Sequence, residues 1–287
     1  MKILNFGSLN IDTTLFVDGF AAAGKTISAA SMKQSFGGKG LNQSVAMARA
    51  GATVFHAGKV GRDGASLRDF LHECGVDVSY VATSDKPTGC AMIQVDKRGE
   101  NRIVVYGGAN RDISREYADE VLSHFGAGDM AVLQNEISNV GYIARRAHEK
   151  GMTVVLNPSP IDGLDVDMND VDILILNENE AEALFGSADA EKVAGEAGRK
   201  YPKMRVVLTL GERGSRFIGG GETFSVDAVK VNAVDTTGAG DTFTGYFLAG
   251  IVGGATTRDA METASRAAAI AVTRKGAAES VPKREEI

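Results

Sequence analysis

A regular alternation of short apolar strands and helices through the middle of the chain most constrains the fold. Helices are expected over residues 115–125, 142–149, 178–184 and 188–200. Strands are expected between and after them, at 130–134, 153–156, 171–176 and 205–209. Short strands separated by helices pair in parallel, and helices then cover both faces of the sheet. We therefore predict an α/β fold with a mostly parallel central sheet.

The N-terminal third adds strands and a hairpin to this series. Strands are expected at 2–6 and 13–17, and a helix over 41–50 is expected to end at Gly51. Two alternating strands at 90–95 and 102–106 flank a charged, turn-rich connector, which predicts a β-hairpin. Because this hairpin interrupts the helix–strand series, we interpret it as a flap or lid.

Polar residues follow the ends of the expected strands. Parallel sheets bind ligands beyond the carboxyl ends of their strands, so these residues are expected to lie along one edge. They are Asn10, Asp12, Asn135, Glu136, Asn157, Asn177, Glu180, Thr209, Gly211 and 238–241. Amides and carboxylates gathered in this way predict a site for hydroxyl groups and for a metal–phosphate.

The turn 238–241 is the first candidate for the chemistry. An apolar strand is expected before it at 229–234, and a helix after it at 243–251. The small residues Gly238, Ala239 and Gly240 leave backbone N–H groups free to face an anion at a helix N-terminus. Asp241 would repel that anion, so we interpret it as a general base for an attacking hydroxyl. On this stretch alone, Asp241 is equally well explained as a first-turn acid favoured by the helix dipole.

A second glycine-rich turn, 37–40, opens the expected helix 41–50. Its glycines would let the backbone and the Lys39 charge approach a ligand, and Asn42 in the first turn would point at the same ligand. The alternative is a plain glycine-rich entry to a helix.

Residues 19–26 match the phosphate-binding pattern G-x-x-x-x-G-K-[ST] letter for letter. A P-loop needs a buried strand before it and a helix after it. The following residues 27–35 show no helical apolar stripe and soon meet Gly37. We therefore predict that this segment is not a P-loop.

Composition excludes several classes of function. The net charge of -6 argues against a nucleic-acid partner, and no apolar run approaches the ~18 residues of a membrane span. Cys74 and Cys90 show no CxxC spacing, which favours a reduced, cytoplasmic compartment. The four histidines lack ligand spacing, so a zinc site and a hydrolase triad are not expected.

Together these motifs resemble the ribokinase-like carbohydrate kinase family over nearly the whole chain. Any one is weak, and their order and spacing carry the resemblance. The chain departs from the family pattern at Leu41, where an alanine is usual. The matching segments are Asn10 with Asp12, 37–42, 177–180, 209–211, 235–241 and 271–277.

The resemblance implies roles for these residues. Asp241 would be the catalytic base, and Gly238, Ala239 and Gly240 would form the anion hole for the transferring phosphate. The sugar would be bound by Asp241 together with Asn10, Asp12, Gly38, Lys39, Asn42 and Glu136.

The resemblance also implies three further ligands. ATP would bind at Asn177, Thr209, Gly211, Gly214 and Gly240. Mg²⁺ would be placed by Glu180 with Asn177, through water. A monovalent cation, expected to be K⁺, would be bound mostly through oxygens by Asp235, Thr237, Ala271, Arg274, Gly276 and Ser280.

The implied protein is a cytoplasmic, ATP-dependent kinase that phosphorylates the primary hydroxyl of a pentose. D-Ribose is the expected pentose, and the product would be ribose 5-phosphate. Another sugar or a nucleoside (deoxyribose, a fructose-type sugar) is the alternative substrate, and a non-catalytic sugar sensor is the alternative class. Residues 1–287 are expected to form one domain with a discontinuous β lid at about 13–35 and 88–106, and a homodimer is expected to pair through the lid.

Overall fold

A computed structural model describes all residues 1–287 and contains a nine-stranded sheet in the order β13-β12-β11-β10-β9-β8-β1-β4-β5. The strands from β11 to β5 are parallel, and β12 and β13 continue the sheet antiparallel. The predicted mostly parallel α/β fold is confirmed. The strands are β1 (Ile3–Phe6), β4 (Val54–Val60), β5 (Asp77–Thr83), β8 (Met130–Gln134), β9 (Thr153–Asn157), β10 (Ile173–Asn177), β11 (Arg205–Thr209), β12 (Ser215–Gly219) and β13 (Glu222–Val226).

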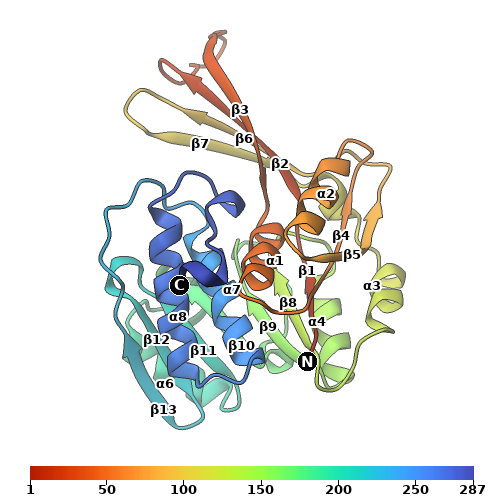
Figure 1. Cartoon of the computed structure of the whole chain (residues 1–287), viewed down its shortest axis with the longest axis vertical. Coiled ribbons are helices and arrows are strands. Elements are labelled where there is room, and N and C mark those ends of the chain that lie inside the picture. The colour runs from red at the N-terminus through yellow and green to blue at the C-terminus, as the bar shows by residue number, and fades with distance from the viewer.

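Eight helices cover the two faces of this sheet (Figure 1). One apolar core contains side chains from α1 (Lys39–Arg49), α2 (Ala65–Glu73), α7 (Ala239–Val252) and α8 (Thr257–Val272). The other contains side chains from α3 (Arg115–Leu122), α4 (Val140–Glu149), α5 (Glu178–Phe185) and α6 (Ala190–Lys200).

Successive side chains along each strand contribute to the two apolar cores in turn. Ile3 and Leu4 are neighbours in β1, both are fully buried, and they belong to opposite cores. Successive strand side chains point to opposite faces, so a strand covered by helices on both sides reads as a continuous apolar run. Each buried methylene contributes about 0.8 kcal/mol, and this burial is what holds the layers together.

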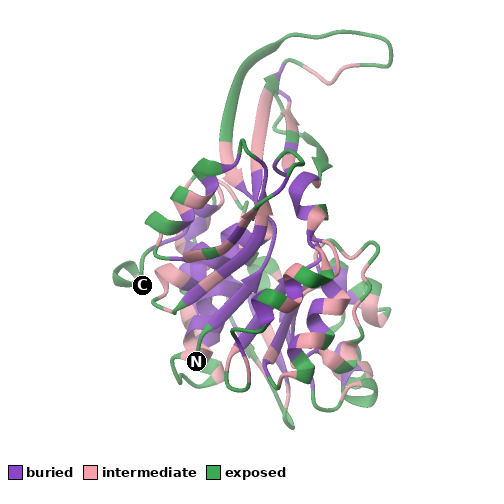
Figure 2. Cartoon of the chain, turned by 90° about the vertical axis from the view of Figure 1, so that its right-hand side faces the viewer, coloured by how far each residue is buried: buried purple, intermediate pink, exposed green.

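A separate four-stranded sheet, which we call the lid sheet, projects from the body (Figures 1 and 2). Its order is β3-β2-β6-β7, and β6 and β7 form the predicted antiparallel hairpin. The strands are β2 (Asn10–Val17), β3 (Ala29–Gly37), β6 (Cys90–Val95) and β7 (Asn101–Tyr106). Much of β3 and all of β7 are exposed.

Two local predictions are wrong. Residues 229–234 form no strand, and Val229, Val231 and Val234 are exposed. Alternating β-branched residues read as a strand, but this segment pairs with no neighbouring strand after β13 ends. Asn10 and Asp12, which were expected between the strands 2–6 and 13–17, lie inside β2, because Asn10 pairs with Gly37 and Asp12 with Ser35. Strands β3, β5, β12 and β13 were not predicted.

The pattern-matching segment 19–26 lies in the connection between β2 and β3. A strand of the lid sheet follows it where a P-loop requires a helix, so the prediction that it is not a P-loop is confirmed. None of the helices is long and apolar enough to cross a membrane.

Candidate active site

The turn before α7 combines a left-handed glycine with free backbone donors. Gly238 has φ 75°, and a Cβ there would lie 3.0 Å from the Cα of Ala277. The Ala239 N–H donates to the carbonyl of Thr236 at 3.2 Å, whereas the N–H groups of Gly240 and Asp241 donate no hydrogen bond within the chain. The Gly238 N–H likewise donates no hydrogen bond, so of the three expected donors those of Gly238 and Gly240 are free, and the N–H of Asp241 adds another.

Gly240 lies in helical backbone, and a Cβ added there would meet nothing within 4 Å. Neither its backbone conformation nor its packing within the chain requires glycine. The missing side chain instead leaves open space at the start of α7, in the turn that carries the free N–H groups. Together with the positive end of the α7 dipole, this space fits an anion that approaches from outside.

Two side-chain amides from α1 hold the carboxylate of Asp241. Nδ2 of Asn42 donates to Oδ2 of Asp241 at 2.9 Å, and Nε2 of Gln43 donates to Oδ1 at 2.9 Å. Asp241 is 7% exposed, and its carboxylate is thus a buried, oriented acceptor at the same turn as the free N–H groups. Asn42 Oδ1 is itself buried without a hydrogen-bond partner in the chain.

Lys39 lies among three carboxylates. Burial alone would lower the pKa of the Lys39 ammonium, but Asp241, Glu136 and Glu180 raise that pKa above its ordinary value. Glu136 also accepts from the Lys39 N–H at 2.9 Å and from the hydroxyl of Ser8. The charged ammonium therefore connects the expected sugar, base and metal residues in one electrostatic cluster.

Contacts within the chain explain why the 37–40 turn contains glycines. Gly38 has φ 94°, and a Cβ at Gly40 would lie 2.3 Å from the backbone nitrogen of Ser8. The helix α1 therefore begins tightly against the segment that follows β1. A Cβ at Gly37 would overlap Asp12 Oδ2 at 1.9 Å. These contacts support the structural explanation of the glycines and bring Lys39 and Asn42 to the site as well.

Asp12 and Asn10 lie where β2 leaves the body. Oδ1 of Asp12 accepts from the Ala91 N–H at 3.2 Å. Burial raises the pKa of the Asp12 carboxyl to about 6, with smaller increases from Glu136 and Glu279. The buried Oδ1 of Asn10 accepts from Nδ2 of Asn110 at 2.8 Å.

Two of the expected nucleotide residues lie side by side in the sheet, since Asn177 of β10 pairs in register with Thr209 of β11. Asn177 also caps α5: its Oδ1 accepts from the Glu180 N–H at 3.0 Å, and its N–H donates to Glu180 Oε2 at 3.0 Å. Its Nδ2 donates to Oε1 of Glu180 at 3.0 Å. This capping box fixes the buried Glu180 carboxylate, and each oxygen keeps a lone pair for water.

Gly211 and Gly214 differ in how closely the rest of the chain packs against them. Gly214 has φ 87°, and a Cβ there would lie 2.1 Å from the carbonyl of Val226, so this glycine is needed for packing against the end of β13. Gly211 has φ 57°, and a Cβ there would meet nothing within 4 Å. The open side at Gly211 leaves the backbone accessible beside Thr209.

The expected cation residues form one pair of loops. Asp235 Oδ1 accepts from the Thr237 N–H at 3.0 Å, and its Oδ2 accepts from the Gly276 N–H at 3.0 Å. Burial alone would raise the Asp235 pKa, but these N–H donors lower it below its ordinary value. Ser280 Oγ donates to the Ala277 carbonyl at 2.8 Å, and the Arg274 N–H donates to the Ala271 carbonyl at 3.0 Å.

The Arg274 side chain pairs with Glu286 at 2.5 Å and is directed to the C-terminal segment. Arg274 would therefore meet the expected cation through its backbone and not through its guanidinium. Leu41 is fully buried in the core shared by α1 and α7. Its departure from the family pattern therefore changes core packing, and Leu41 presents no surface to a sugar.

Residues that the sequence did not single out complete the site. Gln43 contacts the Asp241 carboxylate, Asn110 contacts Asn10, and Asn157 accepts from Gln43 at 3.2 Å. Asn157 stood among the polar residues that follow a strand, but it received no role. Gln43 lies next to Asn42 in a helix, and neighbouring helix positions ordinarily face different directions, so no local pattern pointed to it.

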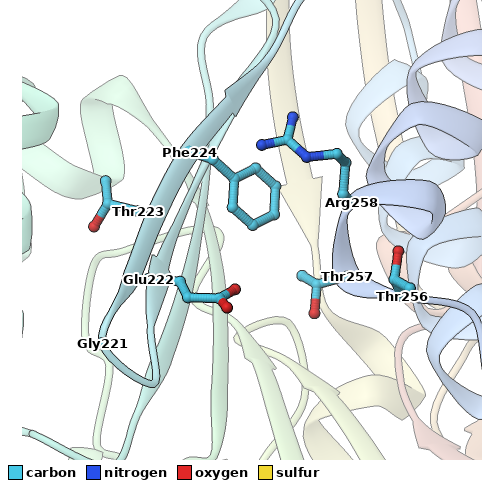
Figure 3. A pocket seen from close by; sticks show the side chains of 7 residues that line it. All are labelled: Gly221, Glu222, Thr223, Phe224, Thr256, Thr257 and Arg258. Carbon is cyan, nitrogen blue, oxygen red and sulfur yellow. The ribbon is translucent and has the colours of Figure 1, made fainter.

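A surface pocket elsewhere contains none of these residues (Figure 3). It is lined by 221–224 on the β12–β13 hairpin and by 256–258 at the start of α8. The expected cation residues Ala271 and Arg274 lie at the other end of α8, about 20 Å away at 1.5 Å per residue. No group of three or more His, Cys, Asp or Glu side chains could hold a metal ion without a ligand's help.

Comparisons with known proteins agree with this geometry. The profile of the pfkB family of carbohydrate kinases matches residues 1–284. The ribokinase of Haemophilus influenzae is 36% identical over 290 residues, which cover 98% of this chain and 95% of that protein. The ribokinase of Bacillus subtilis is 36% identical over 292 residues and is covered to 98% of its length.

Solved structures show the same likeness over the whole chain. The crystal structure of the ribokinase from Thermotoga maritima has a TM-score of 0.89 at 33% identity and covers 100% of this chain and 97% of its own. The structure of Arabidopsis thaliana ribokinase complexed with ribose and ATP has a TM-score of 0.89 at 29% identity, covering 99% of this chain and 96% of its own.

Proposed function

The chain belongs to the pfkB family of carbohydrate kinases, and we propose that it transfers the γ-phosphate of ATP to the primary hydroxyl of D-ribose. The product would be ribose 5-phosphate. The observation that carries this proposal is the pairing of an oriented carboxylate, Asp241, with the free N–H groups at residues 240 and 241. One turn thus offers a proton acceptor and an anion site.

Asp241 acts as the general base. Asn42 and Gln43 occupy one lone pair on each of its oxygens, which leaves lone pairs on the carboxylate for the sugar hydroxyl. As the hydroxyl oxygen attacks the phosphorus, its proton passes to Asp241, and the bond from phosphorus to the leaving oxygen of ADP breaks in line. Burial of Asp241 keeps water away from the carboxylate.

The negative charge of the transferring phosphoryl group is stabilised by the start of α7. The free N–H groups of Gly240 and Asp241 and the positive end of the helix dipole lie together at the start of α7, beside the open space at Gly240. Lys39 adds a positive charge among the carboxylates Asp241, Glu136 and Glu180. Without this ammonium, three nearby carboxylates would repel the incoming phosphates.

The sugar pocket is formed by Asn10, Asp12, Asn42 and Glu136, with the backbone at Gly38. Carboxylate and amide oxygens hold vicinal hydroxyls, and a buried unpaired one rejects sugars that lack the matching hydroxyl. Asn42 Oδ1 is such an unpaired acceptor in the free protein. It contributes to selectivity for a sugar with a hydroxyl at that position.

ATP binds along the neighbouring ends of β10 and β11, at Asn177, Thr209 and the open backbone of Gly211. The protein alone offers no three-ligand metal cluster. Glu180 would hold Mg²⁺, through water, with the lone pairs that Asn177 leaves free. When bound, the ion neutralises phosphate charge.

The loops 235–237 and 271–280 would hold a monovalent cation, K⁺. Asp235 ties these loops together through Thr237 and Gly276, and Gly238 packs against Ala277. Backbone carbonyls and the Ser280 oxygen supply oxygen ligands of the kind that a hard cation prefers. The links through Asp235 and the packing of Gly238 against Ala277 connect these loops to the turn that carries the free N–H groups.

Two subunits pair through the lid sheet. Ile103, Val104, Val105 and Met32 are 54–70% exposed on its strands. β7 is also an edge strand of the lid sheet. An exposed apolar patch and an open strand edge are both features that a second subunit covers. The free, partly buried Cys74 and Cys90 fit the proposed cytoplasmic location.

A sugar panel in an assay coupled to ADP production tests the substrate. D-Ribose is expected to give the highest kcat/KM among ribose, deoxyribose, fructose and nucleosides, and omission of K⁺ is expected to lower turnover. A higher kcat/KM for a nucleoside or a hexose would overturn the choice of ribose. Sugar binding without any ADP production would overturn the proposed kinase activity.

A further inference from the structure

Behind the Asp241 carboxylate runs a buried chain of side-chain amides. We propose that Gln43 is a positioning residue that fixes the orientation of Asp241, and that Gln134 and Asn5 fix Gln43. The inference rests on the proposed function, since it assigns a task to groups behind the proposed base. It adds residues that touch neither sugar nor nucleotide.

Gln43 meets the Asp241 carboxylate on the side opposite Asn42. Its Nε2 donates to Asp241 Oδ1 at 2.9 Å and also to Asn157 Oδ1 at 3.2 Å. Gln43 is fully buried, so water does not replace either bond. With Oδ2 held by Asn42 and Oδ1 held by Gln43, the carboxylate is prevented from rotating about its Cβ–Cγ bond.

Gln134 determines which way the Gln43 amide faces. Nε2 of Gln134 donates to Oε1 of Gln43 at 2.7 Å, so that oxygen is directed away from Asp241. A flipped Gln43 amide would place its carbonyl against the carboxylate and its NH₂ against the donor of Gln134. Both contacts would be repulsive in a site without water.

Asn5 fixes Gln134 in turn. Oδ1 of Asn5 accepts from Nε2 of Gln134 at 3.0 Å, and its Nδ2 donates to the Gly40 carbonyl at 2.8 Å and to Ser44 Oγ at 2.7 Å. The chain ends at His56, whose Nδ1 lies 2.8 Å from Ser44 Oγ. Burial lowers the His56 pKa to about 4, so the imidazole is neutral and brings no charge into the chain.

This arrangement costs more than an apolar core would, because each amide must be desolvated. The members come from different elements: Asn5 from β1, Gln43 from α1, Gln134 from β8 and Asp241 from α7. A network whose terminal contact is the proposed base positions that base to within a fraction of an ångström. Precision of that kind acts on the rate of the chemical step.

Gln43→Met tests the inference, because methionine has about the same length and cannot hydrogen-bond to Asp241. We expect kcat to fall about 10- to 100-fold while KM for ribose and for ATP changes less than about threefold. The folded fraction is measured by circular dichroism at the assay temperature, and kcat is expressed per folded molecule. A role in stability alone would lower the melting temperature and leave this kcat unchanged, which would overturn the inference.

Gln134→Met is the second variant, and it keeps the inference testable if Gln43→Met does not fold. Gln134 Oε1 is buried without a partner, so the substitution also removes an unpaired acceptor. We expect a smaller fall in kcat, about three- to tenfold, with KM unchanged. Unchanged kcat in both folded variants would overturn the inference, whereas a wild-type protein without kinase activity would overturn the proposed function instead.

Discussion

The side-chain amide of Asn42 donates to the carboxylate of Asp241 at 2.9 Å, although 199 positions of sequence separate the two residues. The contact joins the starts of α1 and α7, the two helices that carry the glycine-rich turns. It joins Asn42 of the proposed sugar pocket directly to Asp241, the proposed base. The predictions below follow from this junction and from the groups around it.

Gly240→Ala tests the proposed anion site without destabilising the fold. Since a Cβ at 240 meets nothing within 4 Å, the substitution in helical backbone is expected to stabilise the protein by about 0.5–1 kcal/mol. The same methyl group would occupy the phosphate space, so kcat is expected to fall at least tenfold. Gly195→Ala in α6 is the matched control, because its Cβ also meets nothing within 4 Å. Equal activity of the two variants would contradict the assignment of the anion site.

Asp12 should make sugar binding depend on pH. Its carboxyl has a pKa raised to about 6, so it is protonated below that pH and accepts fewer hydrogen bonds from hydroxyls. The Kd for ribose is expected to increase as the pH falls from 8 to 5. Isothermal titration over this range checks the trend, and a Kd independent of pH would contradict it.

The same residue predicts a pH-dependent stability. The pKa of Asp12 rises from 3.8 to about 6 on folding, so its contribution to stability is fully present below pH 3.8 and is lost as the pH rises through about 6. Asp12→Asn removes this loss and keeps an acceptor for the Ala91 N–H. The melting temperature of the variant is expected to exceed that of wild type by more at pH 8 than at pH 5. A difference independent of pH would show that Asp12 does not titrate in this way.

Asp235→Ala should weaken the activation of the enzyme by K⁺. The substitution removes the acceptor that joins the Thr237 and Gly276 N–H groups, so the two loops lose their connection. Activation of kcat by K⁺, titrated against Na⁺ at constant ionic strength, is expected to decrease about tenfold or disappear. Asp227→Ala, an exposed acid earlier in the same segment, is the control. An unaltered K⁺ response in Asp235→Ala would place the cation elsewhere.

Charges on the lid sheet should separate the subunits. Val105 is 64% exposed on β7, and Val105→Lys would bring two lysines into a paired lid. Sedimentation is expected to show a dimer for wild type and a monomer for the variant. Val234→Lys, at a 58% exposed valine outside the lid sheet, should remain dimeric. A monomeric wild type would contradict the proposed dimer.

The parts of the fold that the sequence predicted were those with local signals. Apolar runs and helix ends located β8 to β11 and the helices between them, and the order of motifs located Asn42, Lys39 and Asp241. The apolar alternation at 229–234 led to a wrong prediction of a strand, because a strand also requires a partner strand that local sequence does not reveal. β12 and β13 were missed in the same region.

Side-chain contacts between distant segments were beyond local patterns. Gln43 is adjacent to Asn42, yet its contact with Asp241 depends on how α1 crosses α7. Leu41 departs from the family pattern beside Asn42, but the helix directs its side chain into the core. Glycines were equally ambiguous, since Gly40 is required by packing against Ser8 whereas Gly240 has open space.

Asp241→Asn, in a direct assay of turnover and sugar binding, tests the central claim most directly. Asparagine fills the same space but cannot accept the hydroxyl proton, so kcat is expected to fall by about 10²–10⁴-fold. The Kd for ribose, measured by titration calorimetry, is expected to change less than about threefold. Turnover equal to that of wild type in the folded variant would contradict the role of Asp241 as the base, and with it the proposed mechanism.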